Sequence, residues 1–181
     1  MVDIERRKKL ALHLRHLSVG QISNDEFESN IMDDVSHDWL PEQYYRAKES
    51  KNDDKIIQPM LELCWGLYDD TRNHKLKGSD KLSEESFKII ARCILFLQSD
   101  KEYEWPYFDT ANPFFKFSLA EIVKSILTFG KYFKDKRREQ ELAYVEFQKL
   151  GNFDIWPFLY QKDYEEKLKN PTFLSRDKII F

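Results

Sequence analysis

The most apolar stretch of the chain covers residues 83–99, and it has a clear start. Ser83 can accept a hydrogen bond from the first helical turn, and the two glutamates after it carry negative charge where the helix dipole favours it. Over residues 89–97, Arg92 is the single polar residue. A helix that is apolar nearly all round is typical of a buried position. We therefore predict a central core helix over residues 83–99, with the other helices packed around it.

Two helices are predicted at the start of the chain. Over residues 3–17, leucines recur at helical spacing, and Gly20 is a residue type favoured just past a helix end. Ser23 and Glu26 then form a capping box, in which each side chain accepts a hydrogen bond from the other residue's backbone. The box predicts a second helix over residues 24–35.

A further amphipathic helix is predicted in the second half of the chain. Ser118 and Glu121 form another capping box. Apolar residues then trace one face: Leu119, Ile122, Val123, Ile126, Leu127 and Phe133. Gly130 weakens or bends this helix by about 1 kcal/mol relative to alanine. The mixed charges over residues 134–141 indicate an exposed helix or turn, and residues 161–169 predict a last short helix.

Helical spacing also predicts a helix over residues 41–47 and another that Pro59 opens or kinks. Residues 69–82 form the connection into the core helix, with a turn at Gly78. No segment shows the sustained alternation of apolar and polar residues that is typical of strands. The sequence therefore predicts an all-α fold: a single domain over residues 1–181, built as an irregular bundle of about six to eight helices.

Composition narrows the possible functions. The chain has 181 residues, with 41% hydrophobic and 34% charged residues, which is typical of a folded domain. Its net charge of −3 argues against a general nucleic-acid binder and is compatible with a basic protein partner. The basic run over residues 6–9 departs from this balance. A solvated helix face is its simpler interpretation, and a contact with phosphate or with an acidic partner is the sharper one.

The expected location is the cytoplasm. Residues 1–17 are charged and lack the apolar core of a signal peptide, and no stretch is long and apolar enough to span a membrane. Cys64 and Cys93 each lie within an apolar helical run, which predicts buried free thiols. We expect no membrane partner and no cofactor.

Two clusters of acidic residues and histidine could carry chemistry: Asp33, Asp34, His37 and Asp38 in the first, and Asp69, Asp70 and His74 in the second. A carboxylate that orients an imidazole suits a general base or a metal ligand. The two clusters form a metal site if their helices meet in space. The chain lacks the Glu-x-x-His motif of di-iron helical proteins and the other specific catalytic motifs. We therefore assign no catalytic residue and no metal ligand.

Two aromatic segments resemble one another. Residues 103–107 and 153–158 each place an aromatic residue and an acid shortly before Trp-Pro-aromatic. Trp105 and Tyr107 in the first segment are candidates for an exposed partner contact, because Trp and Tyr are enriched at interface hot spots. Packing over the bundle, or chance, is the simpler interpretation of the two segments.

Residues 17–27, and residues 96–100 with the Tyr-Glu-Trp-Pro of residues 103–106, resemble stretches of small uncharacterised bacterial helical proteins. Small acidic proteins of this kind are similar in character to immunity proteins, which neutralise bacterial toxins. The resemblance implies a non-enzymatic protein that binds another protein. It defines no functional residues.

Two hypotheses follow. The first is a non-enzymatic protein-binding module, an immunity-type inhibitor of a basic partner. Its candidate contacts are Asp33, Asp34, Asp69, Asp70, Trp105 and Tyr107. The alternative is a metal-dependent hydrolase that uses the acid–histidine clusters at helix ends. The overall charge disfavours a nucleic-acid partner. The identity of the partner and the oligomeric state stay open.

Overall fold

The computed structural model describes residues 1–36, 53–105 and 119–169. Within these ranges the chain forms seven α-helices and no strand, which confirms the all-α prediction. The helices are α1 (Ile4–Ser18), α2 (Asn24–Asp34), α4 (Ile57–Trp65), α5 (Glu84–Leu97), α6 (Leu119–Leu127), α7 (Lys131–Leu150) and α8 (Gln161–Lys169). Short 3-10 turns occupy Gly78–Asp80 and Phe153–Ile155. The helix predicted over residues 41–47 and the cap predicted at Ser118 lie outside the described residues.

Local sequence signals start α2 and α5 and follow the end of α1, as predicted. Ser23 Oγ accepts a hydrogen bond from the backbone N–H of Glu26 at 3.3 Å, and Glu26 Oε2 accepts one from the N–H of Ser23 at 2.7 Å. Ser83 Oγ accepts a hydrogen bond from the first turn of α5. Gly20, after α1, adopts a φ of 65°, a conformation that glycine reaches without a steric cost. The capping box at the start of α2 is therefore confirmed.

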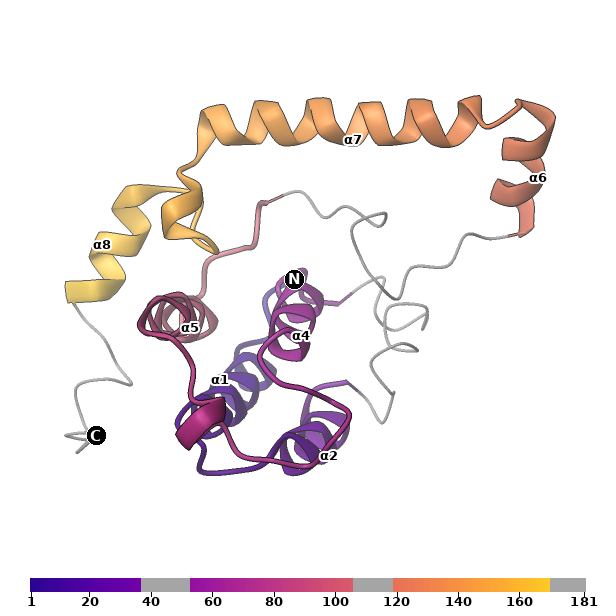
Figure 1. Cartoon of the computed structure of the whole chain (residues 1–181). Coiled ribbons are helices and arrows are strands. Elements are labelled where there is room, and N and C mark those ends of the chain that lie inside the picture. The colour runs from indigo at the N-terminus through magenta and orange to yellow at the C-terminus, as the bar shows by residue number, and fades with distance from the viewer. Residues whose placement is uncertain (37–52, 106–118, 170–181) are drawn as a thin grey trace.

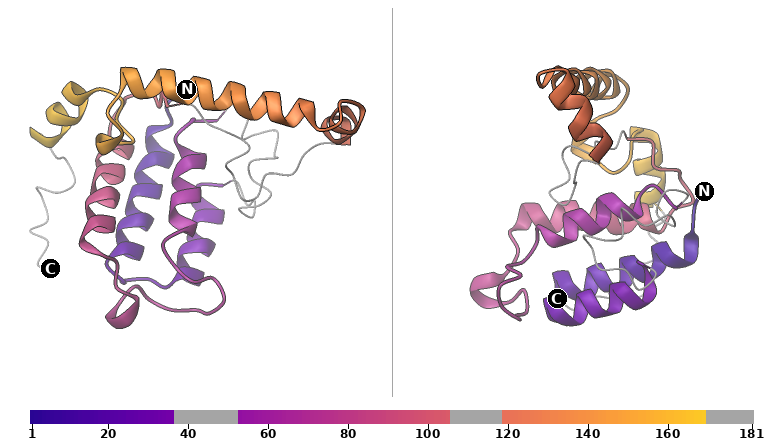
Figure 2. Two further views of the ribbon diagram at one scale, coloured as in Figure 1. Left: turned by 45° about the horizontal axis from the view of Figure 1, so that its top comes forward. Right: turned by 90° about the vertical axis from the view of Figure 1, so that its right-hand side faces the viewer.

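The helices α1, α2, α4 and α5 form the body of the bundle (Figures 1 and 2). The helix α1 packs against both α2 and α5. Its inward residues, Leu10, Ala11, Leu14 and Leu17, are fully buried, as are Ile56, Ile57 and Met60 at the start of α4. On α5 the burial is continuous from Cys93 to Leu97. The predicted core helix is thus confirmed, and α1 shares the centre of the core with it.

The last three helices extend from this body. The helix α8 packs against α5, where Lys167 donates a hydrogen bond to the Gln98 carbonyl at 2.7 Å. The helix α7 has 20 residues and is therefore about 30 Å long. It runs from the bundle outwards as an arm, with α6 at its far end (Figure 1). None of the described helices is long and apolar enough to cross a membrane.

Both cysteines are buried free thiols, as predicted. Cys64 on α4 and Cys93 on α5 are at most 1% exposed. Burial raises the pKa of both thiols, because a thiolate has little solvation in an apolar core. Neither thiol is in the activated state that cysteine catalysis requires.

Candidate functional site

The acidic end of α2 is tied to α1. Asp34 Oδ1 accepts a hydrogen bond from Lys9 Nζ at 2.8 Å, and Asp34 Oδ2 forms one with His13 Nε2 at 2.8 Å. The hydrogen bond from Lys9, followed by that with His13, lowers the pKa of Asp34. Asp33 is exposed. Negative charge at a helix C-terminus is unfavourable, and here the Lys9 cation offsets it.

The second acidic pair lies in the loop after α4, because α4 ends at Trp65. Asp69 Oδ1 accepts hydrogen bonds from the backbone N–H of Thr71 at 3.0 Å and from its hydroxyl at 2.6 Å. These bonds lower the pKa of Asp69. Asp70 is exposed. Asp70 and His74 therefore do not share a helix face, and the spacing that suggested a carboxylate–imidazole pair has no helical basis.

Asn24 holds this loop against α2. Its amide Nδ2 donates to the Arg72 carbonyl at 3.1 Å, and its Oδ1 accepts from the backbone N–H of His74 at 2.7 Å. The backbone N–H of Asn24 also donates to the His74 carbonyl at 3.1 Å. The Arg72 side chain pairs with Asp80 at 2.6 Å, so this ion pair lies within the segment that connects α4 to α5. The loop is thus docked by an asparagine that the sequence did not single out.

The two acid–histidine clusters do not converge among the described residues. The loop with His74 docks at Asn24, the first residue of α2, whereas Asp34 is the last. These two positions are about 15 Å apart along the helix axis. In the described part of the chain, no group of three or more histidine, cysteine, aspartate or glutamate side chains could hold a metal ion. His37 and Asp38, two members of the first cluster, lie outside the described residues.

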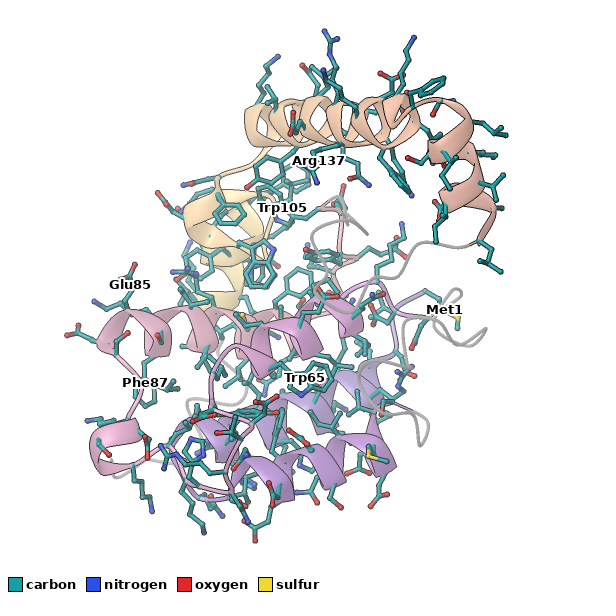
Figure 3. All side chains as sticks on the ribbon, turned by 45° about the vertical axis from the view of Figure 1, so that its right-hand side comes forward. Met1, Trp65, Glu85, Phe87, Trp105 and Arg137 are labelled. Carbon is teal, nitrogen blue, oxygen red and sulfur yellow. The ribbon has the colours of Figure 1, made fainter. Side chains whose placement is uncertain are left out.

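Trp105 is a core residue. Its side chain is 5% exposed, and its indole N–H donates to the Phe158 carbonyl at 3.1 Å. Reciprocally, the indole N–H of Trp156 donates to the hydroxyl of Tyr103 at 3.1 Å. Residues 103–105 and 153–158 therefore pack against each other, below the end of α7 that adjoins the bundle (Figure 3). Packing is thus the correct interpretation of Trp105, which is not available as a partner contact. Tyr107 lies outside the described residues.

The basic run at the start of α1 is only half solvated. Lys8 and Lys9 are exposed, as predicted, but Arg7 is 0% exposed, and a solvated face is wrong for it. Its Nη1 donates to the carbonyls of Ser99 at 3.1 Å and of Lys101 at 2.8 Å. The sequence did hold a signal for this network, because two consecutive arginines meet two consecutive aspartates: Arg6 pairs with Asp53, and Arg7 with Asp54.

Six exposed large apolar side chains lie on α6 and at Phe129, two residues after the helix ends. Leu119, Ile122, Val123, Ile126, Leu127 and Phe129 are between 40% and 101% exposed. We name this set the α6 face. All except Phe129 follow the helical spacing of one stripe. Phe129 has a φ of 50°, which is uncommon for a bulky residue, and its ring stands fully in solvent.

The orientation of α6 is the reverse of what is usual for an amphipathic helix. Its polar side faces α7: Glu121 pairs with Lys136 at 2.9 Å, and the Lys124 ammonium lies 5.7 Å from the centre of the Tyr132 ring. Its apolar stripe faces outwards. A helix in a globular protein normally turns its apolar face to the core. The sequence predicted the stripe from Leu119 to Leu127, but its placement of Phe133 on the same helix face is wrong, because α6 ends at Leu127 and Phe133 lies on α7. The spacing does not indicate whether the stripe is exposed.

Positive charge is concentrated in α6 and the first half of α7. Residues 119–138 contain six basic and two acidic side chains, a net charge of +4 in a chain whose total is −3. The basic residues are Lys124, Lys131, Lys134, Lys136, Arg137 and Arg138. A large exposed apolar surface on a folded protein is typical of an interaction site.

Comparison of this chain with protein-family models, with curated proteins and with solved structures found no match.

Proposed function

We propose that this protein is a protein-binding module and that it binds through the α6 face. The observation that carries the proposal is the reversed orientation of α6, which pairs its polar side with α7 and leaves its apolar stripe in water. Monomeric proteins rarely expose contiguous apolar patches of more than a few hundred Å². Six side chains of this size, at these exposures, present on the order of 700 Å².

The energetics of α6 support the same proposal. The helix has nine residues, and helices shorter than about 12 residues are marginal in water without tertiary packing. Burial of its apolar stripe against another polypeptide would supply that packing. A bound partner therefore stabilises α6, and α6 in turn provides most of the contact area.

The resemblance to immunity proteins favours one form of this function, the inhibition of a basic partner. Of the four acidic candidates, Asp34 and Asp69 are engaged by internal hydrogen bonds. Asp33 and Asp70 are exposed, and we place the electrostatic part of the proposal on these two. A partner that contacts them gains association rate more than affinity.

A comparative capture experiment tests the proposal. The tagged protein, its Phe129→Asp variant and its Leu168→Asp variant are cross-linked in the cells of origin, and the attached polypeptides are quantified. Leu168 is an exposed leucine on α8, so its substitution makes an equal chemical change outside the α6 face. We expect at least one polypeptide to be lost from Phe129→Asp and retained by Leu168→Asp. In a binding assay with purified components, that polypeptide should bind the wild-type protein at least tenfold more tightly than it binds the Phe129→Asp variant. Identical capture by all three proteins would refute binding through the α6 face.

A further inference from the structure

We infer that α6 is bound as a helix in an apolar groove of the partner protein, and that the walls of this groove carry acidic residues. The inference rests on the proposed function and states the chemistry of the surface that the α6 face meets. The width of the apolar stripe, the position of Phe129, the clearance around α6 and the charge beside it lead to this assignment.

The apolar stripe of α6 has the pattern of a helix that binds in a groove. Positions i, i+3, i+4 and i+7, the anchors that such helices use, are Leu119, Ile122, Val123 and Ile126. The outermost members of the stripe, Ile122 and Leu127, are five positions apart and therefore about 140° apart around the helix axis. Both are exposed, at 40% and 73%. A flat surface does not contact both edges of so wide a stripe, whereas the two walls of a groove do.

Phe129 occupies a backbone position that glycine usually fills. The N–H of Gly130 donates to the Ser125 carbonyl at 2.7 Å and closes the end of α6, while Phe129 has a φ of 50°. Glycine is the usual residue just past a helix end, because a Cβ is disfavoured in this conformation. The ring of Phe129 is 101% exposed, so no packing in the described chain offsets the backbone cost. An anchor that fills the end of a partner's groove accounts for it.

The surroundings of α6 leave room for a groove. Of the described helices, only α7 packs closely against α6, and it does so on the polar side. Both helices stand apart from α1, α2, α4 and α5 (Figures 1 and 2). The walls of a groove can therefore enclose the apolar stripe from two sides while the body of the bundle stays clear of the partner.

Exposed basic side chains lie near the α6 face, at the start of α7. They are Lys131, Lys134, Arg137 and Arg138. None of these four forms an ion pair with another described residue. The Cα atom of Lys131 is at most about 8 Å from that of Phe129, which is the screening length at physiological salt. The two arginines follow Lys136, which pairs with Glu121 of α6.

This charge selects an acidic groove. Over residues 119–138, Asp135 is the single exposed acid. A groove that encloses α6 meets positive charge at its edge, so acidic walls complement it and basic walls are repelled. Asp33 and Asp70 lie elsewhere, at the end of α2 and in the loop after α4. A partner that seats α6 between acidic walls can therefore still present a basic surface to these two aspartates.

Photo-cross-linking in the cells of origin tests the groove. Benzoylphenylalanine replaces one residue at a time: Ile122 or Leu127 at the two edges of the stripe, or Leu168 on α8 as the control. All three side chains are exposed, so the substitutions do not threaten folding. We expect positions 122 and 127 to attach to the same polypeptide through two separate segments of it, which are the two walls. Each attached segment should contain more acidic than basic residues, and position 168 should not attach to that polypeptide.

Charge reversal on α7 tests the acidic walls. The probe is the purified polypeptide that attaches at positions 122 and 127. Lys131→Glu with Lys134→Glu keeps the fold, because glutamate is favoured in the first turn of a helix. This variant should bind the probe about tenfold more weakly than the wild type at low salt, and the difference should shrink at high salt. Lys162→Glu with Lys169→Glu makes the same change in net charge at exposed sites on α8, and its affinity should stay within about twofold of the wild type.

Three results would overturn the inference: attachment at only one edge of the stripe, attached segments with more basic than acidic residues, or an affinity that the reversal of Lys131 and Lys134 leaves unchanged. Each of them keeps the proposed function, because a polypeptide is still bound through the α6 face. If neither position 122 nor position 127 attaches to a polypeptide, both the inference and the proposed function fail. Co-sedimentation of the wild type, and not of Phe129→Asp, with phosphatidylglycerol vesicles would then assign the α6 face to a membrane surface.

Discussion

Arg7 and Asp54 hold each other through two hydrogen bonds in the interior, with side-chain exposures of 0% and 2%. Nε of the guanidinium donates to Oδ2 at 2.6 Å, and Nη2 donates to Oδ1 at 2.8 Å. The guanidinium carbon also lies 5.3 Å from the centre of the Phe96 ring. The pair thus joins α1 to the segment before α4 and to the end of α5.

Asp54→Ala should lower the free energy of unfolding by about 3–5 kcal/mol, because it leaves the Arg7 cation buried and without its counter-ion. The double variant Arg7→Met, Asp54→Leu should recover most of that loss, since it removes both charges and keeps apolar volume. Urea unfolding of the three proteins measures both effects. Lys8→Met, next in sequence but exposed, should change stability by less than about 0.5 kcal/mol. Equal losses for Asp54→Ala and the double variant would contradict this account.

Asp34 gives the stability a pH dependence at acidic pH. Its folded pKa lies below its ordinary value of 3.8, chiefly because of the hydrogen bond from Lys9. Such a carboxylate stabilises the fold above its unfolded pKa, and the contribution is lost as the pH falls through the folded pKa. Asp34→Asn should therefore cost about 0.5 kcal/mol at neutral pH, the size expected for a partly exposed ion pair.

Urea unfolding as a function of pH measures the effect of Asp34. The difference between the wild type and Asp34→Asn should shrink as the pH falls below 3.8. The exposed neighbour Asp33 provides the matched control, Asp33→Asn. A difference that persists unchanged to the lowest pH would show that Asp34 acts through packing and not through its charge.

Gly151 stands where a side chain does not fit. A Cβ atom at this position would clash with Leu159 Cδ1 and would lie 3.0 Å from the Leu159 carbonyl oxygen and 3.1 Å from Trp105 Cζ2. Gly151→Ala should therefore destabilise the protein by about 1–3 kcal/mol, as overpacking does. Gly66→Ala is the control, because its Cβ would meet the Leu63 carbonyl at an ordinary 3.4 Å and Gly66 has a negative φ. Thermal unfolding compares the two variants, and similar melting temperatures would count against the packing argument.

Cys64 and Cys93 should react with a disulfide reagent only when the fold opens. Both are buried, and burial raises the pKa of both thiols, so the native protein presents almost no thiolate. We expect the labelling rate to rise with urea in parallel with unfolding. A Ser79→Cys variant, which adds a thiol at an exposed site, should label one equivalent at once. Prompt reaction of the two native thiols would place at least one of them near solvent.

Charge reversal at Asp33 and Asp70 tests the basic-partner form of the proposed function. Once a protein partner has been purified, Asp33→Lys with Asp70→Lys should slow its association at low salt by about tenfold and change its dissociation little. Stopped-flow association at two ionic strengths measures the effect. Asp33→Asn with Asp70→Asn should give an intermediate rate. Association rates that do not differ among the three proteins would remove these aspartates from the interface.

The sequence predicts the local features of this fold well, because their causes lie within a few residues. The capping box of Ser23 and Glu26, the serine that starts α5 and the glycine that follows α1 each act on the nearest helical turn. The apolar side chains that make α5 recognisable in the sequence are also the ones that leave water on folding, so the same residues bury the helix. These local signals are enough to predict an all-α fold from the sequence.

Arg7, Asn24 and Trp105 show what sequence pattern alone leaves undetermined. Each has partners about 50 or more residues away: Asp54 for Arg7, the loop at residues 72–74 for Asn24, and the Phe158 carbonyl for Trp105. A basic run near a chain end resembles a solvated surface unless the buried aspartate that neutralises it is known. The α6 stripe differs in that its apolar spacing suggested burial, whereas its side chains are exposed. Helical spacing is the same whether another polypeptide covers the face or not.

Arg7 also bears on how the protein is made. Its guanidinium reaches the carbonyl of Lys101, 94 residues further along the chain. A ribosome that adds roughly 5–20 residues per second needs on the order of 5–20 s to synthesise that interval. Throughout this time α1 lacks the hydrogen bond from Arg7 to the Lys101 carbonyl. The contacts that fix α1 are thus complete only after the chain through α5 and residue 101 has been synthesised.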